Sequence, residues 1–239
     1  MYILGVRIDN LSLEKSLDRI NGFLTDGRQH YIVLPYSDFL VRAQKDEEFK
    51  RILNQADLSL SDGVGPVLAS HIAGQEALKG RVTGIDLIWA LFAGLGVKHG
   101  VFLFGAKEGA AQEAAKNILQ KAPQAKIAGT INGYVGDEEA ISAINRSGAE
   151  ILLVALGMPK QEKWIYDNLK KMPNVKVAIG VGGAFDFISG RIRRAPRFMQ
   201  KIGLEWLWRL FAQPSHWRKT WRSIVVFSWL AIKSTFSHS

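Results

Sequence analysis

The chain lacks cysteine, metal-type histidine spacing and long apolar runs, and each absence excludes a class of protein. None of its 239 residues is cysteine, which excludes disulfides and cysteine-ligated metals. The five histidines are scattered without the spacing of metal ligands. No stretch reaches the roughly 18 apolar residues of a membrane span, so we expect no transmembrane helix. The N-terminus MYILGVRIDN does not resemble a signal peptide, so we expect a cytoplasmic protein.

Several catalytic motifs are also missing. The chain contains neither a G-x-x-x-x-G-K-[ST] phosphate loop nor a G-x-S-x-G nucleophile elbow. It has no Asp-x-Asp pair, and the DEE triplets at 46–48 and 137–139 are typical of first helical turns. FGAKEG (104–109) lacks the G-x-G-x-x-G spacing of a dinucleotide site. These absences favour a metal-free transferase over a metalloenzyme, an ATPase or a serine hydrolase.

A marked asymmetry of charge is present instead. Residues 191–239, the tail, hold ten basic residues and one acid, Glu205. This surplus of nine equals the net charge of the whole chain, +9, so residues 1–190, the body, are neutral. Five of the seven tryptophans also lie in the tail. A basic, tryptophan-rich tail on a neutral body indicates an anionic partner surface.

Two helices are expected in the tail, at 197–212 and at about 215–236, separated by Pro214. On the second helix, Trp217 and Trp221 share one face, and Arg218 and Arg222 line a neighbouring stripe. Such a helix suits the headgroup layer of a membrane, where each basic residue adds about 1 kcal/mol of attraction. The alternatives are a final helix packed on the core, with solvated arginines, and a nucleic-acid-binding segment.

The body alternates between strand-like and helix-like segments. Strands are expected at 2–9, 31–35, 58–62, 101–105, 126–130, 150–157 and 175–183, and helices at 13–24, 39–53, 86–95, 110–119, 138–144 and 161–169. Several strands are apolar runs without alternation, as in strands buried on both faces. The sequence therefore predicts an α/β fold: a Rossmann-like, mostly parallel sheet flanked by helices in residues 1–190, with residues 191–239 as a basic helical appendage.

Three loops at the expected carboxyl ends of strands are candidate ligand sites. Asp62 in SDGVG is suited to act as a general base or to bind a sugar hydroxyl, and equally to cap the next helix. In ALGMPKQEKW, a helix N-terminus with Gln161 nearby suits a diphosphate, unless it is an ordinary turn. In VGVGGAFDF, glycines precede Asp186, either as a ligand loop or as a turn beside core phenylalanines.

Five segments together resemble one family, the WecG/TagA/CpsF glycosyltransferases. They are FLVRAQKDEEFKRILNQADLSLSDGVG (39–65), RVTGIDL (81–87), GAEILLVALGMPKQEKWI (148–165), GVGGAFDFISGRIRRAP (180–196) and GLEWLWRL (203–210). The resemblance implies an inverting, metal-independent hexosyltransferase without a cofactor. Its donor is a UDP-sugar, of N-acetylmannosamine or a related hexose, and its acceptor is a polyprenyl-diphosphate-linked sugar in teichoic acid, exopolysaccharide or other cell-wall polysaccharide assembly.

The resemblance also implies roles for single residues. Asp62 matches the catalytic aspartate, which as general base takes the proton of the acceptor hydroxyl. Arg81 in RVTG matches an arginine that offsets charge on the leaving UDP. Gln161 matches a residue near the diphosphate, Tyr134 in NGY an aromatic at the uracil, and Asp186 a carboxylate that contacts the base.

The tail is implied to reach the membrane and to complete the active site. Arg209, Arg218 and Arg222 are the candidates for contacts to the acceptor phosphates and the anionic membrane surface. The expected location is therefore peripheral, on the cytoplasmic face of the cell membrane. If tails are mobile in solution, exposed body surface could self-associate, so a homo-oligomer stays open.

One departure from the family pattern concerns the loop after the second expected strand. The family has Thr-Pro-Asn there, whereas this chain has Leu34-Pro35-Tyr36. The roles of the threonine and asparagine therefore do not carry over, and the donor sugar and linkage stay open. A non-catalytic, membrane-associated UDP-sugar-binding module on the same fold is the alternative function, and a nucleic-acid-binding protein is a third hypothesis.

Overall fold

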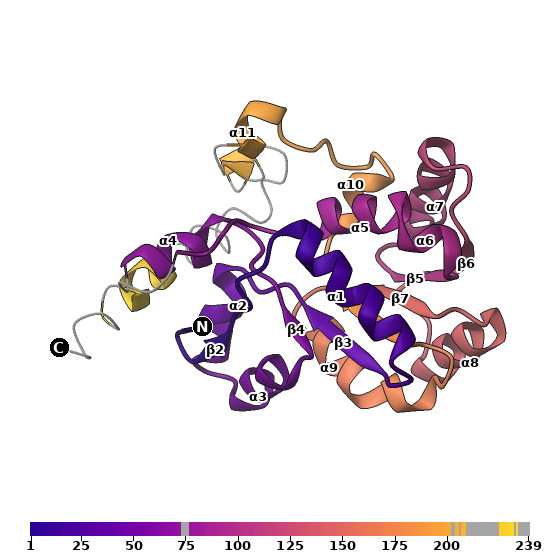
Figure 1. Ribbon diagram of the computed structural model, residues 1–239, viewed down its shortest axis with the longest axis horizontal. Helices are drawn as coiled ribbons and strands as arrows, with labels where there is room; N and C mark the ends of the chain where they lie inside the picture. The colour runs from indigo at the N-terminus through magenta and orange to yellow at the C-terminus, as the bar shows by residue number, and fades with distance from the viewer. Residues whose placement is uncertain (73–76, 202–203, 206, 209–224, 232, 234–239) are drawn as a thin grey trace.

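The computed structural model of the chain describes residues 1–72, 77–201, 204–205, 207–208, 225–231 and 233 (Figure 1). Within them, a six-stranded sheet has the order β4-β3-β8-β7-β5-β6, and every neighbouring pair is parallel. The strands are β3 (His30–Val33), β4 (Leu58–Ser59), β5 (Val101–Gly105), β6 (Ile127–Ile131), β7 (Ile151–Ala155) and β8 (Val177–Gly180).

Helices cover both faces of this sheet (Figure 1). One face packs against α1 (Leu13–Thr25), α5 (Gly84–Ala93), α7 (Ala110–Lys121) and α10 (Ala184–Ile188). The other packs against α2 (Ser37–Ala43), α3 (Glu47–Gln55), α8 (Asp137–Ser147) and α9 (Lys160–Asn168). Also described are α4 (Val64–Ile72), α6 (Leu95–Lys98), the 3₁₀ turn Leu169–Lys171 and α11 (Arg197–Lys201). The predicted α/β fold with a parallel sheet flanked by helices is confirmed.

The apolar runs of the central strands follow from this layering. Successive strand residues point to opposite faces, so a strand covered on both sides needs apolar side chains throughout. In β5, Val101 and Leu103 enter the core under α5 and α7, whereas Phe102 and Phe104 enter the core under α8 and α9. All residues of β5 and β7 are buried.

Two expected elements were wrong in detail. The expected strand 2–9 is a separate antiparallel hairpin of β1 (Tyr2–Ile3) and β2 (Val6–Arg7). Its turn is formed by Leu4 and Gly5, which both have positive φ, 50° and 75°. The periodic segment 39–53 is two helices, because Asp46 begins α3 by accepting a hydrogen bond from the backbone N–H of Phe49 at 3.0 Å.

The direction of the helices changes at β7 and its neighbours. α9 leaves β7 towards one face of the sheet, whereas α7 leaves β5 and α10 leaves β8 towards the other. In open α/β sheets such a reversal opens a crevice at the carboxyl ends of the strands, where ligands bind. The candidate loops of the sequence follow β4, β7 and β8 at this edge.

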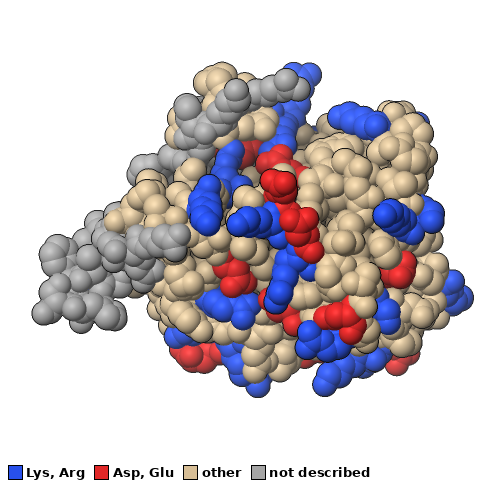
Figure 2. All heavy atoms as spheres, in the orientation of Figure 1, with Lys and Arg blue, Asp and Glu red and all other residues tan. Residues whose placement is uncertain are grey.

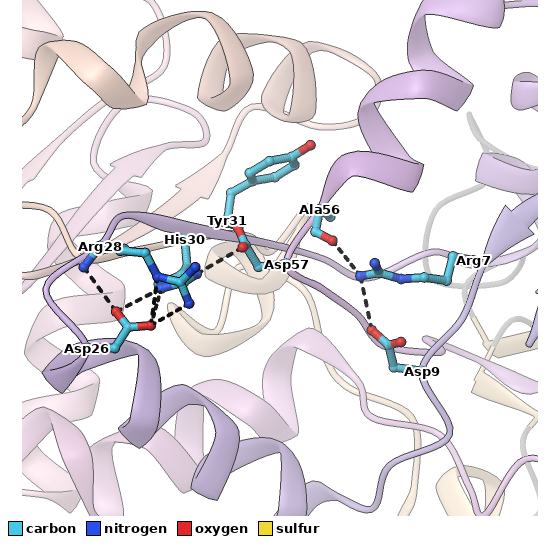
Figure 3. A network of polar contacts seen from close by, with 8 residues as sticks. All are labelled: Arg7, Asp9, Asp26, Arg28, His30, Tyr31, Ala56 and Asp57. Carbon is cyan, nitrogen blue, oxygen red and sulfur yellow. Dashed lines mark hydrogen bonds and ion pairs between the residues drawn. The ribbon is translucent and has the colours of Figure 1, made fainter.

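At the opposite edge, where β3 begins, His30 lies between two carboxylates (Figure 3). Its Nε2 is 3.0 Å from both carboxylate oxygens of Asp26, and its Nδ1 is 2.9 Å from Oδ1 of Asp57. The imidazole also stacks on Phe23, with ring centroids 4.0 Å apart. The hydrogen bond from His30, together with those from Arg28, holds the pKa of Asp26 well below its usual range.

This arrangement predicts a loss of stability in acid. The pKa of Asp26 is lower in the folded chain than in the unfolded chain, where it is about 3.9. The ionised Asp26 therefore makes its full contribution to the free energy of unfolding above its unfolded-state pKa, and this contribution is lost as the pH falls towards the folded-state pKa. We expect Asp26→Asn to lower the free energy of unfolding at neutral pH and to flatten its decline below about pH 5.

Urea unfolding at a series of pH values measures this effect. Asp18→Asn, which removes an exposed carboxylate of α1, is the matched control. An acid decline as steep in Asp26→Asn as in the unsubstituted chain would contradict the role given to Asp26.

Candidate active site

Asp62 and Arg81 lie on neighbouring segments at the carboxyl end of β4. The backbone N–H of Asp62 donates to the carbonyl of Pro35 at 2.9 Å, which joins the loops after β3 and β4. The backbone N–H of Val82 donates to the carbonyl of Ser61 at 2.8 Å, which fixes the Arg81 segment beside the Asp62 loop. Both side chains are half-buried. Two residues singled out in separate sequence segments therefore lie on adjacent backbone segments at one edge of the sheet.

The glycines after Asp62 let this loop pack closely. Gly63 has a φ of +87°, in the left-handed region that favours glycine. At Gly65 a Cβ would lie only 1.9 Å from Oγ of Ser37 at the start of α2. The start of α4 is thus pressed against the start of α2, beside Tyr36.

The two residues that depart from the family pattern have different environments. Leu34 is 3% exposed and packs in the core under α5, where a Cβ on Gly84 would lie 3.4 Å from its Cδ1. Tyr36 is half-buried, with its ring centroid 5.0 Å from that of Phe39. A Cβ on Gly63 would lie 3.9 Å from the Tyr36 Cβ. Leu34 is therefore a core residue, whereas Tyr36 borders the Asp62 loop.

Gln161 lies beneath the two glycine loops that follow β7 and β8. Its side chain is 1% exposed, and its Oε1 accepts hydrogen bonds from the backbone N–H groups of Gly157 at 3.1 Å and Gly182 at 3.0 Å. Gln161 thus ties the two loops together from below. Lys160, the first residue of α9, is exposed.

Asp186 lies on α10 near basic residues of two other segments. Burial raises the pKa of Asp186, and the nearby charges of Lys107 and Arg191 oppose the rise. Lys107 belongs to the loop after β5, and Nε of Arg191 pairs with Oε2 of Glu113 on α7 at 2.8 Å. The carboxylate therefore stands at the edge formed by the β5 and β8 loops, in a basic environment.

Tyr134 stands on the loop after β6 and is 74% exposed. The loop itself is tightly held, because the backbone N–H of Gly133 donates to the carbonyl of Ala106 at 3.0 Å. A Cβ on Gly133 would lie 2.8 Å from Cδ2 of Leu156, so the loops after β5, β6 and β7 touch. An exposed phenol ring on a fixed loop is suited to stack on a flat ligand.

Glu205, the one acid of the tail, contacts Arg81. Its Oε2 is 2.7 Å from Nη1 of Arg81, and its Oε1 is 3.2 Å from Nε of Arg194. Arg194 also pairs with Asp86 at 2.8 Å, and Nη2 of Arg81 donates to the carbonyl of Gln200. Sequence reasoning missed this cluster, although a single acid in a basic tail was a visible signal.

The second described part of the tail, residues 225–231, is helical and packs on the body. Phe227 and Ala231 are each 6% exposed and join the core under α2 and α3. Val225 and Trp229 are 51% and 59% exposed. One face of this helix thus meets the core, as in the packed-helix alternative, while Trp229 remains at the surface.

The tail arginines assigned to the acceptor, Arg209, Arg218 and Arg222, lie outside the described residues. Over the body, acidic and basic side chains are intermixed on the face seen in Figure 2, in keeping with its zero net charge. Among the described residues, no group of three acidic or histidine side chains is arranged to hold a metal. No helix in this part of the chain is both long and apolar enough to span a membrane.

Comparison with known proteins agrees with the resemblance of the sequence segments. The model of the "Glycosyl transferase WecG/TagA/CpsF family" matches residues 1–239. A Bacillus spizizenii protein, N-acetylglucosaminyldiphosphoundecaprenol N-acetyl-beta-D-mannosaminyltransferase, is 34% identical over 199 residues, which cover 82% of this chain and 77% of the relative. A Bacillus subtilis protein of the same name is 36% identical over 182 residues, or 74% and 69% of the two chains. The chain belongs to the glycosyl transferase WecG/TagA/CpsF family.

Proposed function

We propose that this protein transfers an N-acetylmannosamine-type sugar from UDP to N-acetylglucosamine on a polyprenyl diphosphate. The observation that supports it best is that the backbone segments of Asp62 and Arg81 are adjacent at the carboxyl edge of the sheet. The names of both Bacillus relatives describe mannosaminyl transfer to an N-acetylglucosaminyl-diphosphate lipid. The proposed reaction is inverting and needs no metal.

In the proposed reaction, the half-buried Asp62 carboxylate takes the proton of an acceptor hydroxyl as that oxygen attacks the anomeric carbon. The bond from the anomeric carbon to the UDP oxygen breaks, and UDP leaves with the electron pair. Attack from the face opposite UDP inverts the anomeric centre. Arg81 offsets the charge that develops on UDP. A guanidinium has five N–H donors, so its bonds to Glu205 and Gln200 leave donors for a phosphate.

The donor is proposed to lie across the loops after β5 to β8. The exposed ring of Tyr134 stacks on the uracil, and Asp186 accepts a hydrogen bond from the base. The diphosphate lies at the N-terminus of α9, near the exposed Lys160. Gln161 acts from below, because its buried amide shapes the two loops.

The acceptor is proposed to be reached from a membrane surface on its cytoplasmic side. Arg209, Arg218 and Arg222 contribute the positive charge for the lipid phosphates. The exposed Trp229 supports this, since tryptophan favours the boundary between water and lipid. The ammonium of Lys233 lies 5.1 Å from the centroid of the Trp229 ring, which places a positive charge beside this tryptophan.

A non-catalytic UDP-sugar-binding module is the second candidate. The observation in its favour is Tyr36, a half-buried phenol that borders the Asp62 loop where the family has an asparagine. It predicts donor binding without turnover.

Asp62→Asn separates these two functions. Transfer from a panel of UDP-sugars to a polyprenyl-diphosphate-N-acetylglucosamine analogue is measured. We expect turnover with one donor and a loss of roughly 100-fold or more in Asp62→Asn, because a general base is removed. Asp167→Asn, an exposed carboxylate of α9, is the control and keeps full activity. Equal turnover in Asp62→Asn would remove Asp62 from the mechanism, and binding without any turnover would favour the module.

Tyr134→Ala tests the base-binding loop. The loss of a stacking partner, about 1–3 kcal/mol for a nucleic-acid base, predicts UDP binding weaker by roughly tenfold. Because Tyr134 is exposed, the melting temperature should not change. Tyr134→Phe keeps the stacking face and should bind UDP nearly as the unsubstituted chain does. Calorimetric titration with UDP measures all three, and unchanged affinity in Tyr134→Ala would place the uracil elsewhere.

Replacing Arg209, Arg218 and Arg222 together by glutamine tests the membrane contact. At about 1 kcal/mol for each residue, the partition coefficient onto anionic vesicles should fall by roughly 100-fold. The control removes the same charge from exposed body positions, with Lys15, Lys98 and Lys170 replaced by glutamine. Co-sedimentation with phosphatidylglycerol vesicles gives the result, and equal losses in both triple variants would show that net charge alone sets binding.

A further inference from the structure

The proposed function gives no role to Glu162, a carboxyl buried beside Gln161. Glu162 is 0% exposed, and its Oε1 accepts a hydrogen bond from Nε2 of Gln161 at 2.6 Å. Its Oε2 is buried without a hydrogen-bond partner among the described residues. Burial raises the pKa of Glu162 to about 7. A buried carboxyl of this kind is costly, so its presence next to Gln161 calls for a physical account.

The Gln161 amide can be seated in two ways, and only one of them satisfies its neighbours. Gly157 and Gly182 both present backbone N–H donors to the oxygen end of the amide. If the amide were turned over, its NH₂ would face these two donors, and both would lose their acceptor. Glu162 presents an acceptor to the nitrogen end, so it selects the orientation in which the oxygen faces the glycines.

The end of β8 is shaped around this pair of side chains. A Cβ on Gly180 would lie 2.9 Å from both Nε2 of Gln161 and Oε1 of Glu162, so a larger residue there would collide with both. Gly157 and Gly182 have φ values of +75° and +55°, so each loop uses a conformation that glycine allows. The buried pair therefore lies against two loops whose glycines can adopt the backbone conformations that these hydrogen bonds require.

We propose that Glu162 is a positioning residue for the donor site, which holds the Gln161 amide so that its oxygen fixes the loops at Gly157 and Gly182. The inference rests on the proposed function in one respect only, that these loops bind the diphosphate of the donor. Glu162 lies wholly beneath the loops and does not touch the substrate.

Two substitutions with side chains of similar length distinguish the role of Glu162 as a hydrogen-bond acceptor from its role in filling space. Glu162→Gln keeps an oxygen that accepts from Nε2 of Gln161, whereas Glu162→Met fills similar space without one. We expect Glu162→Met to bind UDP about tenfold more weakly, the effect of losing one hydrogen bond of typical net strength. We expect it to raise the KM for the UDP-sugar more than it lowers kcat. Glu162→Gln should restore both values to within about threefold of the unsubstituted chain.

A second readout does not depend on UDP or on turnover. Amide hydrogen exchange, followed by NMR on the full chain, reports the hydrogen bonds of the two glycines directly. Glu162→Met should speed amide exchange at Gly157 and Gly182 but leave exchange in β5 unchanged. In Glu162→Gln, exchange at both glycines should equal that of the unsubstituted chain. The melting temperature of Glu162→Met should not fall in parallel with UDP binding, since removing a buried carboxyl whose Oε2 has no hydrogen-bond partner among the described residues offsets the lost bond.

The outcomes distinguish this inference from the proposed function. Unchanged exchange at both glycines in Glu162→Met, or equal losses in the Met and Gln variants, would overturn the positioning role whatever the activity. If exchange and UDP affinity respond as expected but no UDP-sugar is turned over, the positioning role stands and the proposed transfer fails. If exchange responds while UDP affinity is the same in all three chains, the loops do not bind the diphosphate, and the inference fails as a donor-site assignment.

Discussion

Burial of a parallel sheet on both faces is the constraint on which the rest of this structure depends. Because all neighbouring strands of the sheet are parallel, every strand has its carboxyl end at the same edge. The loops that leave β4, β5, β6, β7 and β8 therefore meet there, although they span much of the chain. Helices cover both faces of the sheet, so its central strands need apolar side chains on both sides. In β5 and β7 all residues are buried. Polar chemistry is left to the loops.

The body and the tail are joined by contacts of two kinds. The cluster of Arg81, Glu205, Arg194 and Asp86 has side chains that are 18–41% exposed, and ion pairs in such positions contribute only about 0–1 kcal/mol each. Burial of one large apolar side chain such as Phe227 contributes more, about 1.5–3 kcal/mol. The ion pairs therefore set where Glu205 sits relative to Arg81, while apolar packing supplies more of the attachment.

The sequence was sufficient for the layers and for placing several candidate residues in loops at one edge of the sheet. Unbroken apolar runs predicted several strands of the sheet, and the candidate loops at the ends of β4, β7 and β8 lie at its carboxyl edge. The hairpin at the N-terminus was missed because leucine rarely adopts the left-handed conformation that Leu4 has, so the sequence did not indicate a turn there. The burial of Gln161 was also invisible, since a glutamine in a first helical turn is usually solvated. Its position depends on Gly182, which belongs to a loop that only the folded sheet brings near.

The lack of space at Gly180 has a consequence for any attempt to redesign the donor site. The residues at 161, 162 and 180 occupy one volume, and a change at one of them is felt at the other two. Effects of substitutions at residues in mutual contact are not additive, so scans of single substitutions would underestimate the number of viable combinations. A combinatorial library that varies the three positions together, with smaller side chains at 161 or 162 permitted when 180 gains a Cβ, samples the arrangements that stepwise substitution would reject.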